Sequence, residues 1–323
     1  MIVDLPNTTS AKISKALVRI REEGGAVALG RVLTLIIAAE LGNEEEAIAA
    51  ANDASREHPM RVLVVSTSTS ESAHHDESRV DAQIRVGGDA GASEVIVVTA
   101  HGDAALDQES LVTGLLLPDA PVVAWWPGEA PVSASESPLG RIAQRRITDA
   151  AASARPLDAL HQMCRTYVPG DTDFAWTRLT LWRAQLAAVL DQPPFDSITA
   201  VSVSGAADSP STLLLAAWLQ MQLQVTVSMQ VTEVSPVPTG IHSVVLERKS
   251  GNIQLERDVA SIATLTQPDQ PVHDISLPRR SLRDCLAEEL RRLDPDSLFG
   301  EVVRRGVSEM TGATVGASTK AKK

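Results

Sequence analysis

The chain has 323 residues, of which 44% are hydrophobic and 22% are charged, and its formal net charge at pH 7 is −12. This composition is typical of a globular protein and excludes a mainly disordered chain. The length predicts two domains. An acidic protein repels phosphate backbones and anionic lipid, so we expect neither nucleic acid nor a membrane surface as a partner.

The cellular compartment of the protein is indicated by its two cysteines, Cys164 and Cys285, which lie far apart in the sequence. They are too few for a secreted disulfide framework and wrongly spaced for a zinc ribbon or a C-x-x-C redox site. The N-terminus lacks a basic stretch followed by an apolar one, and no apolar run approaches the ~20 residues of a membrane span. We therefore expect a soluble, cytoplasmic protein with free thiols.

The first part of the chain alternates between helical and strand-like patterns. Apolar residues at helical spacing follow Ser10, and uninterrupted β-branched runs are typical of strands buried on both faces. Asn43 with Glu46 has the pattern of a helix capping box. In chain order the sequence predicts a helix from residue 10 to the Gly24–Gly25 stop, a strand over 31–39, a helix from 43 to 58, a strand over 61–66, a hairpin-like pair over 80–86 and 94–99, and a helix over 106–117.

Two adjacent tryptophans, Trp125 and Trp126, end the next apolar run in a protein that is only 3% aromatic. Neighbouring side chains on a strand point to opposite faces, so each indole needs its own environment. One alternative is that both indoles fill an interior between helix layers. The other is that one indole is exposed and helps to bind a partner, because tryptophan is favoured at protein interfaces.

The second half repeats the alternation of strands and helices. Arg141–Ile147 predicts a basic amphipathic turn or helix, and the helix from 153 onwards ends at Pro169–Gly170, where we place the domain boundary. The strand–helix–strand spacing over 198–231, with Ser209–Pro210 as helix cap and first residue, predicts a parallel crossover. The other predicted elements are a helix from 171 to 190, three antiparallel strands over 243–247, 252–257 and 261–266, and helices over 281–293 and 295–303.

These elements predict a mixed α/β fold, with two tandem α/β domains whose mixed sheets are flanked by helices. The domains are expected over residues 1–168 and 169–310, and residues 311–323 have the composition of a flexible tail.

No catalytic or cofactor motif stands out in the sequence. Phosphate-binding glycine patterns and the G-x-S-x-G elbow are absent, and Ser202-Val-Ser204 lacks the preceding glycine of such an elbow. Gly87–Gly91 is typical of a turn between strands, and His74–Glu77 of a solvated loop rather than a metal site. We therefore predict no metal, no cofactor and no catalytic residue.

Several charged and aromatic residues leave two interpretations open. Asp171 and Asp173 are either helix caps or paired acids for proton transfer. Trp176 and Trp182 do not share one face of a regular helix, and at least one is expected in the core. The arginines Arg141, Arg145 and Arg146 either bind a phosphate or carboxylate group or form a solvated basic face, and Arg279–Arg280 pose the same choice.

Five segments in order resemble the OpcA family, the glucose-6-phosphate dehydrogenase assembly proteins of actinobacteria and cyanobacteria, and most closely its actinobacterial branch. The segments are Gly30–Leu35, Arg56–Val62, Ala124–Gly128, Gly140–Ile147 and Pro169–Asp173 continuing through Trp182–Arg183, and the resemblance extends from about Met1 to Val303. Family-motif positions without an assigned role are Arg31, His58, Arg61, Asp171, Asp173, Trp176, Arg178, Trp182 and Arg183.

The resemblance implies a non-catalytic accessory subunit that binds glucose-6-phosphate dehydrogenase and promotes its active oligomeric form, in support of NADPH production by the oxidative pentose phosphate pathway. A docking surface is then expected at Trp125 and Trp126 together with Arg141, Arg145 and Arg146. The resemblance leaves the chain's own oligomeric state open.

Two other classes of function remain open. The first is a regulator that binds a sugar phosphate or nucleotide near Trp125 and the arginines, and the second is a pathway enzyme such as a lactone hydrolase using Asp171 or Asp173. Neither Cys164 nor Cys285 has the pattern of a redox switch, so no thiol-dependent control is predicted.

Overall fold

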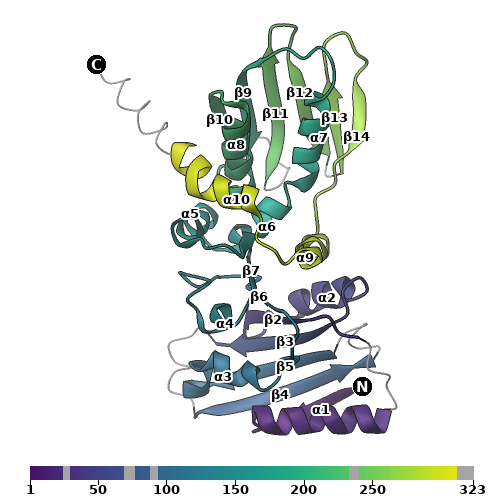
Figure 1. Ribbon diagram of the computed structural model, residues 1–323, viewed down its shortest axis with the longest axis vertical. Helices are drawn as coiled ribbons and strands as arrows, with labels where there is room; N and C mark the ends of the chain where they lie inside the picture. Colours follow the sequence, from purple (N-terminus) through teal and green to yellow (C-terminus); the bar gives the residue numbers. More distant parts are fainter. Residues whose placement is uncertain (25–29, 69–76, 88–93, 233–239, 260, 311–323) are drawn as a thin grey trace, which may run out of the picture. The chain divides into compact units, whose positions relative to one another are not determined.

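The computed structural model describes residues 1–24, 30–68, 77–87, 94–232, 240–259 and 261–310 (Figure 1). The predicted tail over 311–323, the His74–Asp76 part of the predicted loop and the Gly88–Gly91 part of the predicted turn lie outside these residues.

The chain divides into two compact units, each assembled from separate segments. The N-terminal unit combines residues 1–149, 170–172 and 281–295, and the C-terminal unit combines 150–169, 173–280 and the rest of the chain from residue 296. The boundary predicted after residue 168 would assign two helices differently. Helix α5 (Pro156–Thr166) packs with α8 (Pro210–Leu223) in the C-terminal unit, whereas α9 (Leu282–Arg291) packs with α2 (Glu45–Ala54) in the N-terminal unit.

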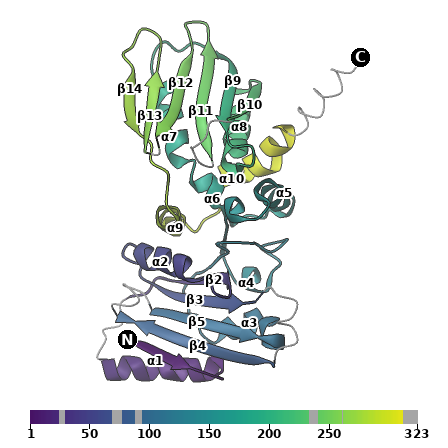
Figure 2. The same cartoon turned by 180° about the vertical axis from the view of Figure 1, so that it is seen from behind.

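An eight-stranded mixed sheet forms the centre of the N-terminal unit, in the order β1-β4-β5-β3-β2-β6-β7-β8 (Figures 1 and 2). The strands β5, β3, β2, β6 and β7 run parallel, and β4 and β1 continue the sheet in antiparallel pairings. The strands are β1 (Ile2–Leu5), β2 (Leu33–Glu40), β3 (Met60–Thr67), β4 (Arg79–Val86), β5 (Glu94–His101), β6 (Val122–Trp125), β7 (Arg145–Thr148) and β8 (Asp171–Asp173).

Burial explains why β2 and β3 occupy the middle of this sheet. The central residues 35–39 of β2 and 62–65 of β3 are apolar on both faces, as parallel strands covered by helices on both sides require. Helix α1 (Ser10–Gly24) packs Ile13, Leu17 and Ile20 against one face, and α2 lies on the opposite side of the sheet (Figures 1 and 2). Two shorter helices, α3 (Gln108–Thr113) and α4 (Pro138–Arg141), contact each other and pack on the same face of the sheet as α1.

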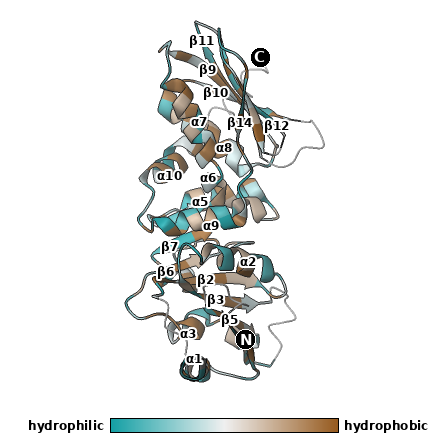
Figure 3. Cartoon of the chain, turned by 90° about the vertical axis from the view of Figure 1, so that its right-hand side faces the viewer, coloured by the Kyte–Doolittle hydropathy of each residue, from teal (hydrophilic) through white to brown (hydrophobic). Residues whose placement is uncertain are grey.

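A six-stranded sheet in the order β10-β9-β11-β12-β13-β14 forms the C-terminal unit. Strand β10 pairs parallel with β9, and α8 connects the two strands along the chain. The remaining pairs are antiparallel. Figure 3 shows this sheet from the side, with α7 and α8 on one of its faces. The elements are α6 (Phe174–Thr177), α7 (Thr180–Leu190), β9 (Ile198–Gly205), β10 (Val227–Val231), β11 (Ile241–Arg248), β12 (Ile253–Val259), β13 (Ile262–Thr266), β14 (His273–Ser276), α10 (Ser297–Glu301) and a π-helical turn over Val302–Gly306.

The predicted fold class, two mixed sheets flanked by helices, is confirmed. The hairpin-like pair is the antiparallel pair β4 and β5, and Ser209 caps α8 with Pro210 as its first residue, as predicted. The crossover from β9 through α8 to β10 is parallel and the later strands are antiparallel, again as predicted.

Four local predictions are wrong. Residues 145–147 belong to strand β7 rather than to a basic turn or helix, because both arginines are paired inside the fold. The predicted helix over 106–117 is helical only from Gln108 to Thr113. The predicted helix over 171–190 divides into β8, α6 and α7. Asn43 does not cap α2, whose N-cap residue is Glu44, and strands β1 and β14 are missing from the prediction.

Candidate functional site

The tryptophan strand β6 lies inside the eight-stranded sheet, between β2 and β7. Trp125 pairs in register with Ile37 on one side and Ile147 on the other, and the next backbone amide, that of Trp126, donates to the Ile147 carbonyl at 2.9 Å. The exposed fractions are 0% for Trp125 and 6% for Trp126. Trp126 packs in the cluster that contains Ile36, Ile96, Leu139 and Ala143.

The expectation that one of the two indoles is exposed is therefore wrong. Each indole lies on its own face of a sheet that helices cover on both sides, which is the interior alternative. The two indoles therefore offer almost no surface for direct contact with a partner.

Arg145 and Arg146 are also buried, and each forms an ion pair inside the N-terminal unit. Arg145 on β7 pairs with Glu289 of α9 and donates a second bond to the Asp294 carbonyl at 2.9 Å. Arg146 pairs with Asp171 and donates to the Ala143 carbonyl at 2.8 Å. A buried guanidinium requires such compensation, so these two arginines are structural and are not a solvated basic face.

Gly170 of the Pro169–Gly170 segment makes room for the Arg146 pair. Its φ is +100°, a conformation that side-chain-bearing residues rarely adopt. A Cβ atom at this position would lie 2.6 Å from the Gln144 carbonyl oxygen and 2.7 Å from Nη2 of Arg146. The glycine thus belongs to the same packing arrangement as the arginine.

The two aspartates have separate structural tasks rather than a shared proton. Asp171 is the partner of Arg146. Asp173 is the N-cap of α6, where its carboxylate accepts from the amide of Ala175 at 2.8 Å and from that of Ala150 at 2.9 Å. The capping interpretation is confirmed for Asp173, and both carboxylates are buried among these donors.

Trp176 and Trp182 lie on different helices of the C-terminal unit, α6 and α7, and both are buried. Arg183 stacks over Trp176, with its guanidinium carbon 3.8 Å from the ring centroid, and the indole Nε1 donates to Asp296 at 2.9 Å. Such stacking is favourable because the ring face is electronegative. The arginines Arg178 and Arg257 make longer contacts of the same kind, at 5.8 Å over Phe174 and 5.3 Å over Trp182.

Arg141 alone among the five predicted docking residues has an exposed side chain. It lies at the end of α4, donates to the Glu136 carbonyl at 2.9 Å and forms an ion pair with Glu109 of α3 at 3.0 Å. This pair joins the segment after β6 to the segment after β5.

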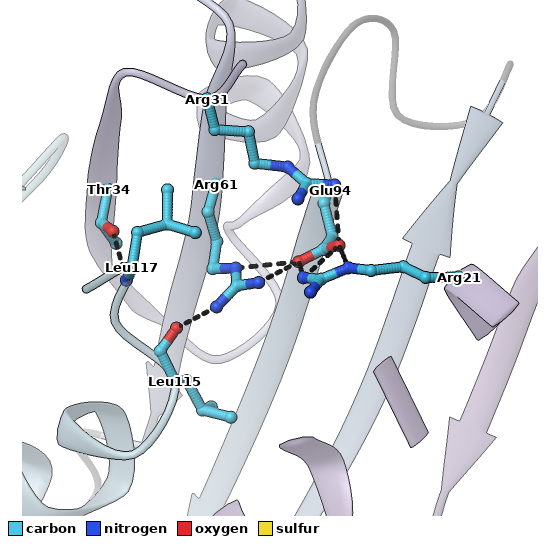
Figure 4. A network of polar contacts seen from close by, with 7 residues as sticks. All are labelled: Arg21, Arg31, Thr34, Arg61, Glu94, Leu115 and Leu117. Carbon is cyan, nitrogen blue, oxygen red and sulfur yellow. Dashed lines mark hydrogen bonds and ion pairs between the residues drawn. The ribbon is translucent and has the colours of Figure 1, made fainter. Parts of the chain in front are cut away.

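Arg31 and Arg61 meet at one buried carboxylate, that of Glu94 (Figure 4). Arg61 of β3 and Glu94 of β5 are direct neighbours in register, and Arg61 also donates to the Leu115 carbonyl at 2.6 Å. Arg21, at the end of α1, is the third arginine on this carboxylate. Burial lowers the pKa of Arg61, and Arg21 and Arg31 lower it further by repulsion while Glu94 opposes them.

Sequence analysis missed Glu94 and Arg21, although one signal was present. Glu94 is a lone acid directly before the apolar run 95–98, and a buried acid needs a cationic partner. His58, another family-motif position, follows α2, and its backbone amide donates to Ala54 at 3.1 Å.

A carboxylate occupies the turn between β2 and α2. Glu44 accepts from the Gly42 amide with both oxygens at 3.0 Å and is also hydrogen-bonded by the Ser66 hydroxyl. The next residue, Glu45, pairs with Arg85 at 2.7 Å, which lowers its pKa. The amino end of α2 therefore already holds negative charge.

The two cysteines differ in exposure but both are free thiols. Burial, together with the charge of Asp173, raises the pKa of the Cys164 thiol to about 12, and Cys285 is fully buried. Among the described residues, no three histidine, cysteine or acidic side chains are placed to hold a metal ion. Within the same residues, no helix has the length and apolar character needed to cross a bilayer.

Two family models match this chain. Residues 51–165 match the model described as the N-terminal domain of the glucose-6-phosphate dehydrogenase subunit (OpcA assembly), and residues 169–303 match the one described as its C-terminal domain. A search of curated proteins found no match.

Two solved structures align with most of this chain at low sequence identity. An oxidoreductase from Sinorhizobium meliloti is 9% identical with a TM-score of 0.51, over 89% of this chain and 98% of its own. A mutant 3-ketoreductase from Actinomadura kijaniata is 11% identical with a TM-score of 0.48, over 88% of this chain and 97% of its own. At such identity the first likeness concerns the fold alone.

Proposed function

Because the chain belongs to the OpcA family of glucose-6-phosphate dehydrogenase assembly subunits, we propose that it is a non-catalytic accessory subunit of that enzyme. It binds the dehydrogenase and favours the active oligomer, and it acts in the cytoplasm in support of NADPH production. The observation that carries the proposal is the ordered match of both family domains over residues 51–165 and 169–303. Placement in the actinobacterial branch stays a prediction from the sequence.

The arrangement of the acidic residues supports a non-catalytic role. A general acid or base needs a carboxylate that can exchange a proton with a substrate. Asp171 is committed to Arg146, and Asp173 is committed to the amides at the start of α6. The lactone-hydrolase alternative required Asp171 or Asp173 as the acid or base, and this arrangement argues against that role for either.

The start of α2 supports the same conclusion for dinucleotide chemistry. In doubly wound sheets a pyrophosphate binds at a helix N-terminus after a glycine-rich turn. Here the turn contains one glycine, Gly42, and its amide already donates a hydrogen bond to the Glu44 carboxylate. A phosphate placed there would be repelled by the carboxylates of Glu44 and Glu45.

An accessory subunit acts by binding one state of its partner more tightly than another. A tenfold shift between two dehydrogenase states requires a difference in binding free energy of about 1.4 kcal/mol. Contacts from a few side chains supply a difference of that size.

We propose that the docking surface lies at the carboxyl ends of β5 and β6. Two of the most exposed apolar side chains of the N-terminal unit come from the segments that follow these strands, Leu106 at 64% and Val132 at 72%. The Arg141–Glu109 ion pair joins the same two segments. Loops at the carboxyl edge of a parallel sheet are common binding sites, and apolar side chains beside an arginine suit a protein partner. We call Leu106, Glu109, Val132 and Arg141 the carboxyl-edge surface.

Binding is tested with the purified dehydrogenase from the same source. The account expects the two proteins to co-elute as a complex, while the isolated chain turns over neither dehydrogenase substrates nor phosphogluconolactone. Turnover by the isolated chain would contradict the non-catalytic role. Separate elution at high concentration of both proteins would contradict the proposal that the dehydrogenase is the binding partner.

A metabolite-binding regulator is the second candidate, favoured by the three arginines that surround Glu94. Ligand binding by the isolated chain, with no effect of the chain on the dehydrogenase, would select this candidate over the first.

A further inference from the structure

A row of three residues in register ends the face of the sheet that α1 covers. Thr34 of β2 pairs with Arg61 of β3, and Arg61 pairs with Glu94 of β5. The next row on this face, Ile36, Leu63 and Ile96, is apolar and fully buried. The polar row therefore lies at the amino ends of the parallel strands, where the apolar core stops.

Three guanidinium groups converge on Glu94 in this row (Figure 4). The shortest distances from the arginine nitrogens to the Glu94 carboxylate oxygens are 3.0 Å for Arg21, 2.9 Å for Arg31 and 2.8 Å for Arg61. Three positive charges on one negative charge leave a local charge of +2. We call these four residues the Glu94 cluster.

Neutralising Glu94 requires one arginine, and the two most buried side chains form that pair. The exposed fractions are 2% for the Glu94 side chain and 7% for the Arg61 side chain. Arg21 and Arg31 add repulsion without being needed for neutrality, and they lower the pKa of Arg61. Holding like charges together in a partly buried place costs free energy, and such costs are typical of binding sites.

The two additional arginines are partly exposed. Their side chains are 35% exposed for Arg21 and 17% exposed for Arg31. Within the described part of the chain, Nη1 of Arg21 and both Nε and Nη1 of Arg31 have no hydrogen-bond partner. Glu94 holds the two guanidinium groups in place, and among the described residues these three nitrogens are the donors left for a ligand.

We propose that the Glu94 cluster is a binding site for a phosphate monoester, with Arg21 and Arg31 as the ligand-contacting residues. A phosphate group carries about −1.5 to −2 charges at pH 7, which matches the local excess of +2. Each unbonded guanidinium N–H can donate a charge-assisted hydrogen bond to a phosphate oxygen. Arg61 and Glu94 are positioning residues.

This site lies at the amino ends of the parallel strands, whereas the carboxyl-edge surface lies at the other ends of β5 and β6. The proposal depends on no contact with the dehydrogenase. Its test uses the isolated full-length chain, so that its failure and the failure of the accessory role are separate results.

The experiment is a calorimetric titration with inorganic phosphate, followed by competition with a hexose monophosphate. The test variant is the double substitution Arg21→Gln with Arg31→Gln, which leaves the Arg61–Glu94 pair intact. The control is Arg19→Gln, on the same helix, whose exposed side chain pairs with Glu23 at 3.9 Å. Far-UV circular dichroism checks that each variant is folded, and Arg31→Gln alone replaces the double variant if that one unfolds.

The expected result is saturable binding of one phosphate per chain by the natural protein and by Arg19→Gln. The double variant should bind about tenfold more weakly or worse, because each lost charge-assisted bond lowers affinity by about that factor. Equal binding by the double variant would overturn the proposal. So would acetate binding as tightly as phosphate at the same ionic strength, or a hexose monophosphate that fails to compete.

Discussion

Arg145 on β7 forms a buried ion pair with Glu289 of α9, 144 residues later in the chain. The pair attaches α9 to the N-terminal unit, where α9 also packs against α2. Thr172 of β8 donates to the same carboxylate at 3.3 Å. The Glu289 carboxylate thus joins α9 to two strands, β7 through the ion pair and β8 through the hydrogen bond.

Removing one partner of this pair should strongly destabilise the N-terminal unit. For Arg145→Ala we expect a loss of about 3–5 kcal/mol in the free energy of unfolding, because Glu289 is left buried and charged. Urea unfolding measures the change. The matched control is Arg145→Met with Glu289→Leu, which removes both charges and should cost less. Equal losses in the two proteins would show that the pair's charge is unimportant.

Trp126→Ala should destabilise the fold by about 3–5 kcal/mol, because the indole is 6% exposed and its removal leaves a cavity. Trp126→Phe should cost less. Both variants should bind the dehydrogenase normally at temperatures where they remain folded. A variant of natural stability that has lost binding would instead place Trp126 in the interface.

The Cys164 thiol should resist alkylation at pH 8, since its pKa is about 12 and the thiolate is the reactive form. The rate of labelling should rise with pH towards 12, and Cys164→Ser should remove that component. The pKa in the folded protein lies above the ordinary cysteine value of 9.0, so this thiol stabilises the fold below pH 9 and that contribution declines from pH 9 towards 12. Labelling at pH 8 as fast as that of a free cysteine would contradict the assignment.

Substitutions on the carboxyl-edge surface should weaken dehydrogenase binding without unfolding the protein. We expect Val132→Asp and Arg141→Glu each to raise the dissociation constant by about tenfold, since both side chains are exposed and central to the proposed contact. Arg19→Glu on α1 is the charge-matched control and should bind normally. Unchanged binding by both test variants would show that the docking surface is not the carboxyl-edge surface.

Local patterns were sufficient for much of the fold. The buried runs of β2 and β3, the Ser209–Pro210 start of α8 and the antiparallel pair β4–β5 follow from periodicity and capping alone. Strand β7 did not, because Arg145 and Arg146 look solvated until their distant partners are known. The composition of the units escaped prediction for the same reason, since α9 joins α2 through contacts that sequence spacing does not reveal.

The candidate site was harder to predict than the fold. Trp125 was correctly placed on a strand and Trp126 follows its end, but which face of a sheet is covered depends on helices elsewhere in the chain. Arg31 and Arg61 were identified by resemblance without a role, and their meeting at Glu94 depends on the register of β3 and β5. Register over such separations is a tertiary property.

The most direct test of the accessory role is a titration of glucose-6-phosphate dehydrogenase from the same source with this protein. Enzyme concentration is held fixed while activity and particle mass are followed together. The account predicts a saturable rise in activity that coincides with the appearance of a heavier complex. Unchanged activity and unchanged mass at a large excess of this protein would contradict it.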